Sequence, residues 1–151
     1  MPARMEVDAN ALELGVKFRA DVDGNITGVR FYKYSQNTGT HIGSIWTTSG
    51  TQLATVTFTN ESASGWQQAT FATPVTITAN TIYIVSYHTN TGFYGVTEPG
   101  FTTAVDNAPL HALSDTTAGG NGVFIYSAGV AFPNQSFNAS NYWVDVVFTP
   151  R

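Results

Sequence analysis

The chain contains no cysteine, so its three histidines are the strongest candidates for metal-binding side chains. His41, His88 and His111 stand far apart, and no compact ligand motif surrounds any of them. Three imidazoles with an open fourth position would suit zinc or copper. Such a metal centre would require the fold to gather all three around one point. The alternative is that each imidazole hydrogen-bonds loop backbone at the end of a strand.

Hydroxyl and carboxylate chemistry lacks a supporting motif. Ser and Thr are abundant, but no Gly-x-Ser-x-Gly nucleophile elbow occurs. A glycosidase would need two acids that face each other across a cleft. The sequence holds ten acids, and it places none of them relative to another. We therefore expect no catalytic residues and no enzyme activity.

Two oxygen-rich segments suit a bound cation, since Ca²⁺ prefers carboxylate and amide oxygens. The run Asp21-Val22-Asp23-Gly24-Asn25 looks like the opening of a calcium loop, but it lacks the later ligands and is better read as a turn. The second segment, Asp106 and Asn107, would need a distant partner such as Asp145 or Glu98. No cofactor is required, and the expectation is one structural calcium at Asp106, Asn107 and Asp145.

Carbohydrate binding needs less machinery than catalysis. Sugars stack on exposed aromatic rings while amides and carboxylates bind their hydroxyls, in sites that are mainly apolar with a few placed polar groups. Aromatic residues next to turns and at strand ends are therefore of interest. The candidate ligand-binding residues are Trp46, Trp66, His88, Tyr94 and Trp143. The alternative for any one of these aromatic residues is burial in the core, with its N–H or O–H bonded to a neighbour.

The composition excludes several classes of partner. Only 11% of the 151 residues are charged, against roughly 25% in an ordinary soluble domain. The net charge is −4 and the six basic residues are scattered, so there is no basic footprint for nucleic acid or for an anionic membrane. No apolar run is long enough to span a bilayer. We expect neither nucleic-acid binding nor membrane insertion.

Short β-rich runs bounded by Gly, Asn, Asp or Pro recur along the chain, and this spacing indicates an all-β sandwich or barrel. The predicted strands are Leu12–Ala20, Ile26–Tyr34, Ile42–Thr47, Gln52–Thr59, Gln67–Ala72, Val75–Ile77, Thr81–His88, Phe93–Val96, Gly122–Tyr126 and Tyr142–Phe148. We predict an antiparallel, jelly-roll-like β-sandwich of about eight to ten strands.

Turn residues and alternation add detail to this fold. Asp23-Gly24-Asn25 predicts a hairpin between the first two strands. Both faces of the strand Thr81–His88 are fairly apolar, which predicts a central strand. The last strand alternates between an apolar face that is predicted to enter the core and a more polar face. The core face holds Tyr142, Val144, Val146 and Phe148, and the other face holds Asn141, Trp143 and Asp145. The stretch from Gly100 to Asn141 holds one predicted strand and reads as a long loop region.

Several of these segments together resemble a bacterial family of secreted modules known as domain of unknown function 4082. The matching motifs are Glu13–Phe18, Gly28–Lys33, Asn37–Gly43 with Trp46, Ser64–Gln67, Tyr83–His88, Pro109–Leu113 and Asn141–Phe148. The resemblance runs from Leu12 to Pro150, so residues 1–11 are predicted to be an N-terminal extension and 12–150 a single domain. It implies a secreted or cell-surface location beside other extracellular β domains, and it supplies no catalytic residues.

These observations predict a non-catalytic module that binds polysaccharide or glycan on behalf of a larger extracellular protein. The alternative is a structural or adhesive spacer, which predicts that Trp46, Trp66 and Trp143 are all buried. A third alternative is a metal-assisted enzyme, which predicts that the three histidines converge. The position of the three tryptophans therefore separates the first two hypotheses.

Overall fold

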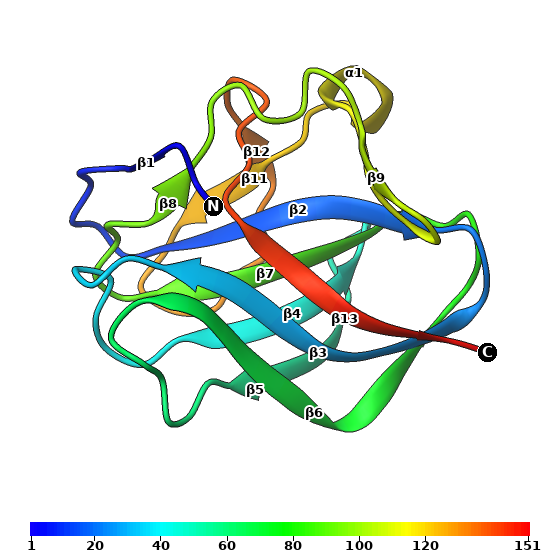
Figure 1. Cartoon of the computed structure of the whole chain (residues 1–151), viewed down its shortest axis with the longest axis horizontal. Coiled ribbons are helices and arrows are strands. Elements are labelled where there is room, and N and C mark those ends of the chain that lie inside the picture. The colour runs from blue at the N-terminus through cyan, green and yellow to red at the C-terminus, as the bar shows by residue number, and fades with distance from the viewer.

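Two antiparallel β-sheets pack face to face in a computed structural model that describes all residues from Met1 to Arg151 (Figure 1). The larger sheet has eight strands, of which six follow one another in the order β12 (Gln135–Ser136), β11 (Val123–Tyr126), β2 (Leu12–Ala20), β7 (Tyr83–Thr89), β4 (Ile42–Thr47) and β5 (Gln52–Thr57). The other two, β10 (Leu110–Ala112) and β9 (Val105–Asn107), form a hairpin that pairs with the end of β2.

The smaller sheet has three strands, in the order β13 (Val144–Pro150), β3 (Gly24–Lys33) and β6 (Gly65–Ile77). A two-stranded ribbon joins β1 (Arg4–Met5) to β8 (Gly95–Val96). The single helix, α1 (Asp115–Ala118), is too short to cross a membrane, and no other helix is present. The predicted antiparallel β-sandwich is confirmed, with more and shorter strands than expected.

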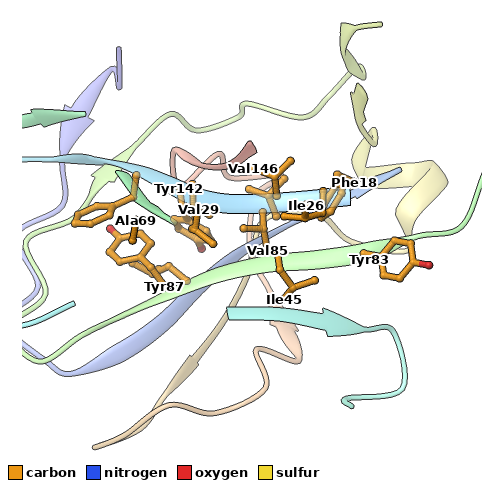
Figure 2. Close-up of a cluster of buried hydrophobic side chains, with 14 of the residues drawn as sticks. Phe18, Ile26, Val29, Ile45, Ala69, Tyr83, Val85, Tyr87, Tyr142 and Val146 are labelled. Atoms are coloured by element: carbon orange, nitrogen blue, oxygen red, sulfur yellow. The ribbon is translucent and has the colours of Figure 1, made fainter. Parts of the chain in front are cut away.

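Alternation along the strands fills the space between the sheets. Side chains on a strand point to opposite faces in turn, so each central strand contributes every second residue to one continuous core of 23 buried residues. Figure 2 shows Val85 and Tyr87 of β7 meeting Ile26 and Val29 of β3 across the interface. Strand β7 lies between β2 and β4 and is buried along its whole length, which confirms the predicted central strand.

The turn at Asp23-Gly24 is a corner between the sheets, so the predicted hairpin is wrong. β2 belongs to the larger sheet and β3 to the smaller one. Gly24 is needed for close packing, because a Cβ atom there would lie 2.4 Å from the ring of Phe148. Asp23 Oδ1 accepts a hydrogen bond from the backbone N–H of Ala79 at 2.8 Å, which joins this corner to the turn before β7.

Two other expectations change in the structure. Gln67–Ala72 and Val75–Ile77 are parts of one strand, β6, which tolerates Pro74 because the strand lies at the edge of its sheet and its pairing with β3 shifts nearby. The predicted core position Phe148 is only half-buried, since a register shift between Val147 and Phe148 interrupts the alternation. The other three members of that core set are buried.

The N-terminal extension packs onto the domain. Pro2 is buried, and a Cβ atom on Gly95 would lie 2.6 Å from the Pro2 ring. The backbone N–H of Glu6 donates to the carbonyl of Tyr94 at 2.8 Å. Residues 1–11 therefore contribute side chains to the surface near β8.

Candidate functional site

The outer face of the smaller sheet carries a continuous strip of aromatic rings, which we call the aromatic platform: Trp143, Trp66, Tyr32 and Tyr34. Ring centroids are 6.2 Å apart for Trp143 and Trp66, 5.7 Å for Trp66 and Tyr32, and 5.8 Å for Tyr32 and Tyr34. The strip forms because Tyr32 of β3 pairs directly with Trp66 of β6, while the backbone N–H of Tyr32 donates to the carbonyl of Trp143. Trp66 is 41% exposed.

A polar row runs beside the platform. Asp145 of β13, Arg30 of β3 and Gln68 of β6 are direct neighbours across the three strands. The guanidinium carbon of Arg30 lies 4.4 Å from the centroid of the Trp66 ring, which is within the range of a cation–π contact. Arg30 therefore fixes the orientation of the most exposed ring of the platform.

Trp143 is held in an unusual backbone conformation. Its φ of 57° lies in the left-handed region, which costs free energy for a residue other than glycine. Its backbone N–H donates to Asn141 Oδ1 at 2.8 Å, and its indole Nε1–H donates to Thr97 Oγ1 at 2.9 Å. These bonds orient the ring toward Trp66, on the solvent side of the sheet.

A groove of about 390 Å³ adjoins the platform. It exists because the three-stranded sheet does not cover the whole inner face of the larger sheet. On one side of the sandwich β5 and β6 approach each other, whereas on the other side β13 packs over β2 and β7 (Figure 1). The groove is lined there by the buried Phe18 and Val85 and by the partly exposed Trp66 and Trp143.

Polar groups are placed at a few points along this mainly apolar groove. Asp145, Asn141 and Asn107 line it. Burial among the groove walls raises the pKa of the Asp145 carboxyl although the side chain still contacts solvent, while its bond from the Val146 N–H and the charge of Arg30 act in the opposite direction. The side chain of Asn107 and the amide NH₂ of Asn141 make no hydrogen bond within the protein, so both remain available to a ligand.

The β9–β10 hairpin that forms one wall of the groove is fastened by His111. Its Nε2 lies 2.7 Å from Asp21 Oδ2 and its Nδ1 lies 2.6 Å from Asp106 Oδ1. Hydrogen bonds to Asp21 and then to Asp106 raise the pKa of His111, so the imidazolium form donates to both carboxylates. Arg19 also pairs with Asp21, at 2.9 Å.

The structure brings together four of the residues predicted from the sequence. Trp66, Trp143, Asn107 and Asp145 all line the groove. Asp106 lies in the same hairpin, but its carboxylate bonds to His111 and it is not among the lining residues. No group of three or more His, Asp or Glu side chains is arranged to hold a metal ion. The structural calcium stays a prediction from the sequence.

The other predicted residues lie elsewhere. Trp46 is buried on the outer face of the larger sheet, where its Nε1–H donates to Ser86 Oγ at 2.8 Å. His88 is buried beside Glu13, and Tyr94 is buried in a separate cavity. Neither Trp46 nor His88 presents a surface to solvent on which a ligand could stack, because later segments of the chain cover both.

Two buried polar clusters lie outside the groove, the first on the larger sheet and the second in segments that connect strands. Ser86 Oγ donates to Glu13 Oε2 at 2.6 Å, and Glu13 Oε1 lies 3.3 Å from His88 Nδ1. The serine hydroxyl therefore bonds to the carboxylate and not to the imidazole, unlike a Ser–His–acid triad. In the second cluster, His41 contacts Glu61 at 2.8 Å and Asn37 at 2.7 Å, and burial lowers the pKa of His41 despite the nearby carboxylate.

Sequence reasoning missed Arg30, Tyr32, Tyr34 and Gln68. The signal was present, because Arg30-Phe31-Tyr32-Lys33-Tyr34 alternates around the buried Phe31 and so places Arg30, Tyr32 and Tyr34 on the outer face. What the sequence did not contain was the pairing of Tyr32 with Trp66, which depends on the register between β3 and β6.

Comparison with protein families gives a match over most of the chain. A family model described as a domain of unknown function, DUF4082, matches residues 1–144. The match covers the platform strands β3 and β6, the β9–β10 hairpin and the start of β13. No curated protein matches the sequence.

Proposed function

Because the chain belongs to the DUF4082 family, whose description assigns no activity, we propose a function from the geometry: a non-catalytic module that binds carbohydrate on the aromatic platform. The observation that carries the proposal is that Trp66 is 41% exposed beside the half-buried Trp143, whereas Trp46 is buried. A spacer without a ligand was expected to bury all three tryptophans.

The shape of the platform suits an extended sugar chain. The rings of Trp143, Trp66 and Tyr32 follow one another along one face with interplanar angles of 56° and 84°, so that a sugar chain can stack on the exposed face of Trp66 and contact the two flanking rings. Arg30 and Tyr32 already hold the Trp66 ring through cation–π and edge-to-face contacts. A ring that is fixed before binding loses little conformational entropy, which favours affinity.

Polar groups beside the rings supply the bonds that fix a sugar's orientation. Asp145 and Gln68 accept or donate from the row next to the platform, and Asn141 and Asn107 do so from the groove. Amides and carboxylates are able to pair with sugar hydroxyls, which both donate and accept. In this proposal the module serves a larger secreted or cell-surface protein, a setting that rests on the family resemblance.

The test is a titration of the protein with a panel of soluble polysaccharides, followed by intrinsic tryptophan fluorescence and isothermal calorimetry. For the glycan class that binds, Trp66→Ala should lower the affinity at least about tenfold, since an exposed tryptophan at the centre of a contact surface carries much of its binding energy. Trp66→Phe should restore part of the loss because it keeps a stacking ring.

The matched control is Phe137→Ala, which removes a 56% exposed ring that lines a different cavity. This variant should bind a glycan without free amino groups like the wild type. Equal affinity for Trp66→Ala and wild type would contradict the platform, and a flat response across the whole panel would favour the spacer. Repeating the titration with a chelator tests the predicted calcium separately.

A further inference from the structure

A second cavity, of about 340 Å³, lies away from the platform where the N-terminal ribbon meets β11 (Figure 1). It shares no lining residue with the groove. Two of its rings are among the most exposed in the molecule, since Tyr126 is 51% exposed and Phe137 is 56% exposed. Among the other aromatic side chains, only Trp66 is comparably exposed.

The charged side chains of this cavity are mostly acidic. Glu6, Asp8 and Glu98 line it with Arg4, so the lining carries a formal charge of −2. The guanidinium of Arg4 forms ion pairs with two of these carboxylates. It bonds to Glu6 and lies 3.4 Å from Glu98. Tyr126 donates its hydroxyl to Asp8 Oδ2 at 2.5 Å. Arg4 and Tyr126 therefore each direct a donor at a carboxylate of the lining, and carboxylate lone pairs remain.

Tyr94 contributes a polar atom without a partner. The residue is 8% exposed, and its hydroxyl makes no hydrogen bond within the protein. The Tyr94 hydroxyl oxygen is nevertheless not fully buried, so it can be reached from the cavity. Burial raises the pKa of Tyr94, so the hydroxyl stays neutral and keeps its oxygen lone pairs. The same hydroxyl is near Glu6, Asp8 and Tyr126, all of which line the cavity.

Burial also raises the pKa of the neighbouring Tyr142 to about 12. The two rings pack edge to face with centroids 5.6 Å apart. At Asp8, burial raises the pKa of the carboxyl, but the hydrogen bonds from Tyr126 and Asn10 outweigh it, so the net pKa lies below its usual value. Asp8 therefore remains negatively charged at neutral pH, next to neutral phenols and exposed rings.

From this combination we propose that the cavity binds a primary ammonium group, of the kind carried by a lysine side chain or an amino sugar. An ammonium donates three hydrogen bonds and accepts none, which matches a lining that holds three carboxylates and the oxygen lone pairs of Tyr94. The rings of Tyr126 and Phe137 add attraction through their electron-rich faces. The negative lining would repel an anion. A neutral alcohol would gain no attraction from the negative charge of the lining.

The experiment compares n-butylammonium with 1-butanol, two probes of nearly equal size that differ in charge. Binding to the whole chain is followed by calorimetry and by amide chemical shifts. Butylammonium should saturate the site with an affinity at least about tenfold above that of butanol. Asp8→Asn should abolish most of this difference, and Phe137→Ala should weaken the cation by about threefold. Arg4→Gln, which removes the internal cation, should tighten binding.

Trp66→Ala is the matched control and should bind butylammonium like the wild type, so failure of this proposal is distinguishable from failure of the glycan platform. Equal affinity for the two probes, or an unchanged cation affinity in folded Asp8→Asn and Phe137→Ala, would overturn the proposal. Two larger probes then identify the source of the ammonium. Preference for acetyl-lysine amide, acetylated only at the α-nitrogen, indicates a polypeptide partner, and preference for glucosamine indicates a glycan.

Discussion

The outer faces of the two sheets carry similar side chains but differ in what covers them. The larger sheet presents Trp46 with Ser86 and Glu13, and the smaller sheet presents Trp66 with Gln68 and Asp145. Residues 127–134, which we call the cover segment, pack Phe132 against Trp46 with ring centroids 5.6 Å apart. No segment covers Trp66 in the same way.

This difference shows that the exposure of a tryptophan is set by a distant part of the chain. Trp46 and Trp66 both lie next to Gly- and Ser-containing turns, and their neighbouring residues are alike in polarity. Phe132 follows Trp46 by more than half the length of the chain, and Gly50 leaves room for it, since a Cβ there would lie 3.3 Å from the Phe132 ring. The covered face has become a second small core, and the uncovered face is free to bind.

The largest expected effect is a difference in the free energy of unfolding between variants of the two tryptophans. Trp46→Ala should lower the free energy of unfolding by about 3–5 kcal/mol, because it removes a buried ring and leaves a cavity. Trp66→Ala should lower it by less than about 1 kcal/mol, since the residue is 41% exposed and its removal leaves no enclosed cavity. Urea denaturation of both variants measures the difference. Similar losses in both would mean that the two faces are equally structural.

A smaller effect is expected from the buried acid of the covered face. His88 Nδ1 faces Glu13 Oε1 at 3.3 Å, and neither of these two buried atoms makes a hydrogen bond. Burial raises the pKa of Glu13, against the opposing effects of His88 and Ser86. The amide of Glu13→Gln would keep the bond from Ser86 and remove a buried carboxylate whose Oε1 lacks a partner, so we expect it to stabilise the protein by about 1–2 kcal/mol at neutral pH.

The same variant should change the dependence of stability on pH. The folded protein holds the Glu13 proton more tightly than the unfolded chain, so this contribution is complete below the ordinary pKa of a glutamate, about 4.3. It is lost as the pH rises through the raised folded pKa of Glu13. Unfolding curves between pH 4 and pH 8 should show this decline in the wild type and a flatter profile in Glu13→Gln. A parallel decline in both would show that Glu13 is not its source.

The sequence predicted the central strands well because their own residues determine them. Leu12–Ala20 and Ile42–Thr47 have the bounds that the structure gives to β2 and β4, and both alternate around the core. The strands β9, β10 and β12 were missed because each has two or three residues and exists through pairing with another strand. A segment of that length carries too few positions for a periodic pattern.

The candidate site was predictable in its components but not in its assembly. Trp66, Trp143 and Asp145 were identified from residue type and alternation. Their proximity depends on the order of β13, β3 and β6 in the smaller sheet, and on the unusual φ of Trp143. The corner at Gly24 sends β3 to the other sheet, and a turn sequence does not distinguish such a corner from a hairpin.

The smallest expected effect concerns the groove beside the uncovered face, whose β9–β10 wall is fastened by a titrating group. Hydrogen bonds to Asp21 and Asp106 raise the pKa of His111. Their stabilising effect is complete below the ordinary pKa of histidine, about 6.5, and is lost as the pH rises through the raised folded pKa. Above it the imidazole keeps one N–H and bonds only one carboxylate.

We therefore expect amide hydrogen exchange in β9 and β10, corrected for its intrinsic dependence on pH, to accelerate severalfold as His111 loses its proton. Exchange in β3 and β6 should not change, because no part of the platform contacts this imidazole through a hydrogen bond. Asp106→Asn should show faster exchange already at low pH and a weaker dependence on pH. Uniform acceleration of the hairpin and the platform would instead indicate global loosening, and the groove would not have one independently mobile wall.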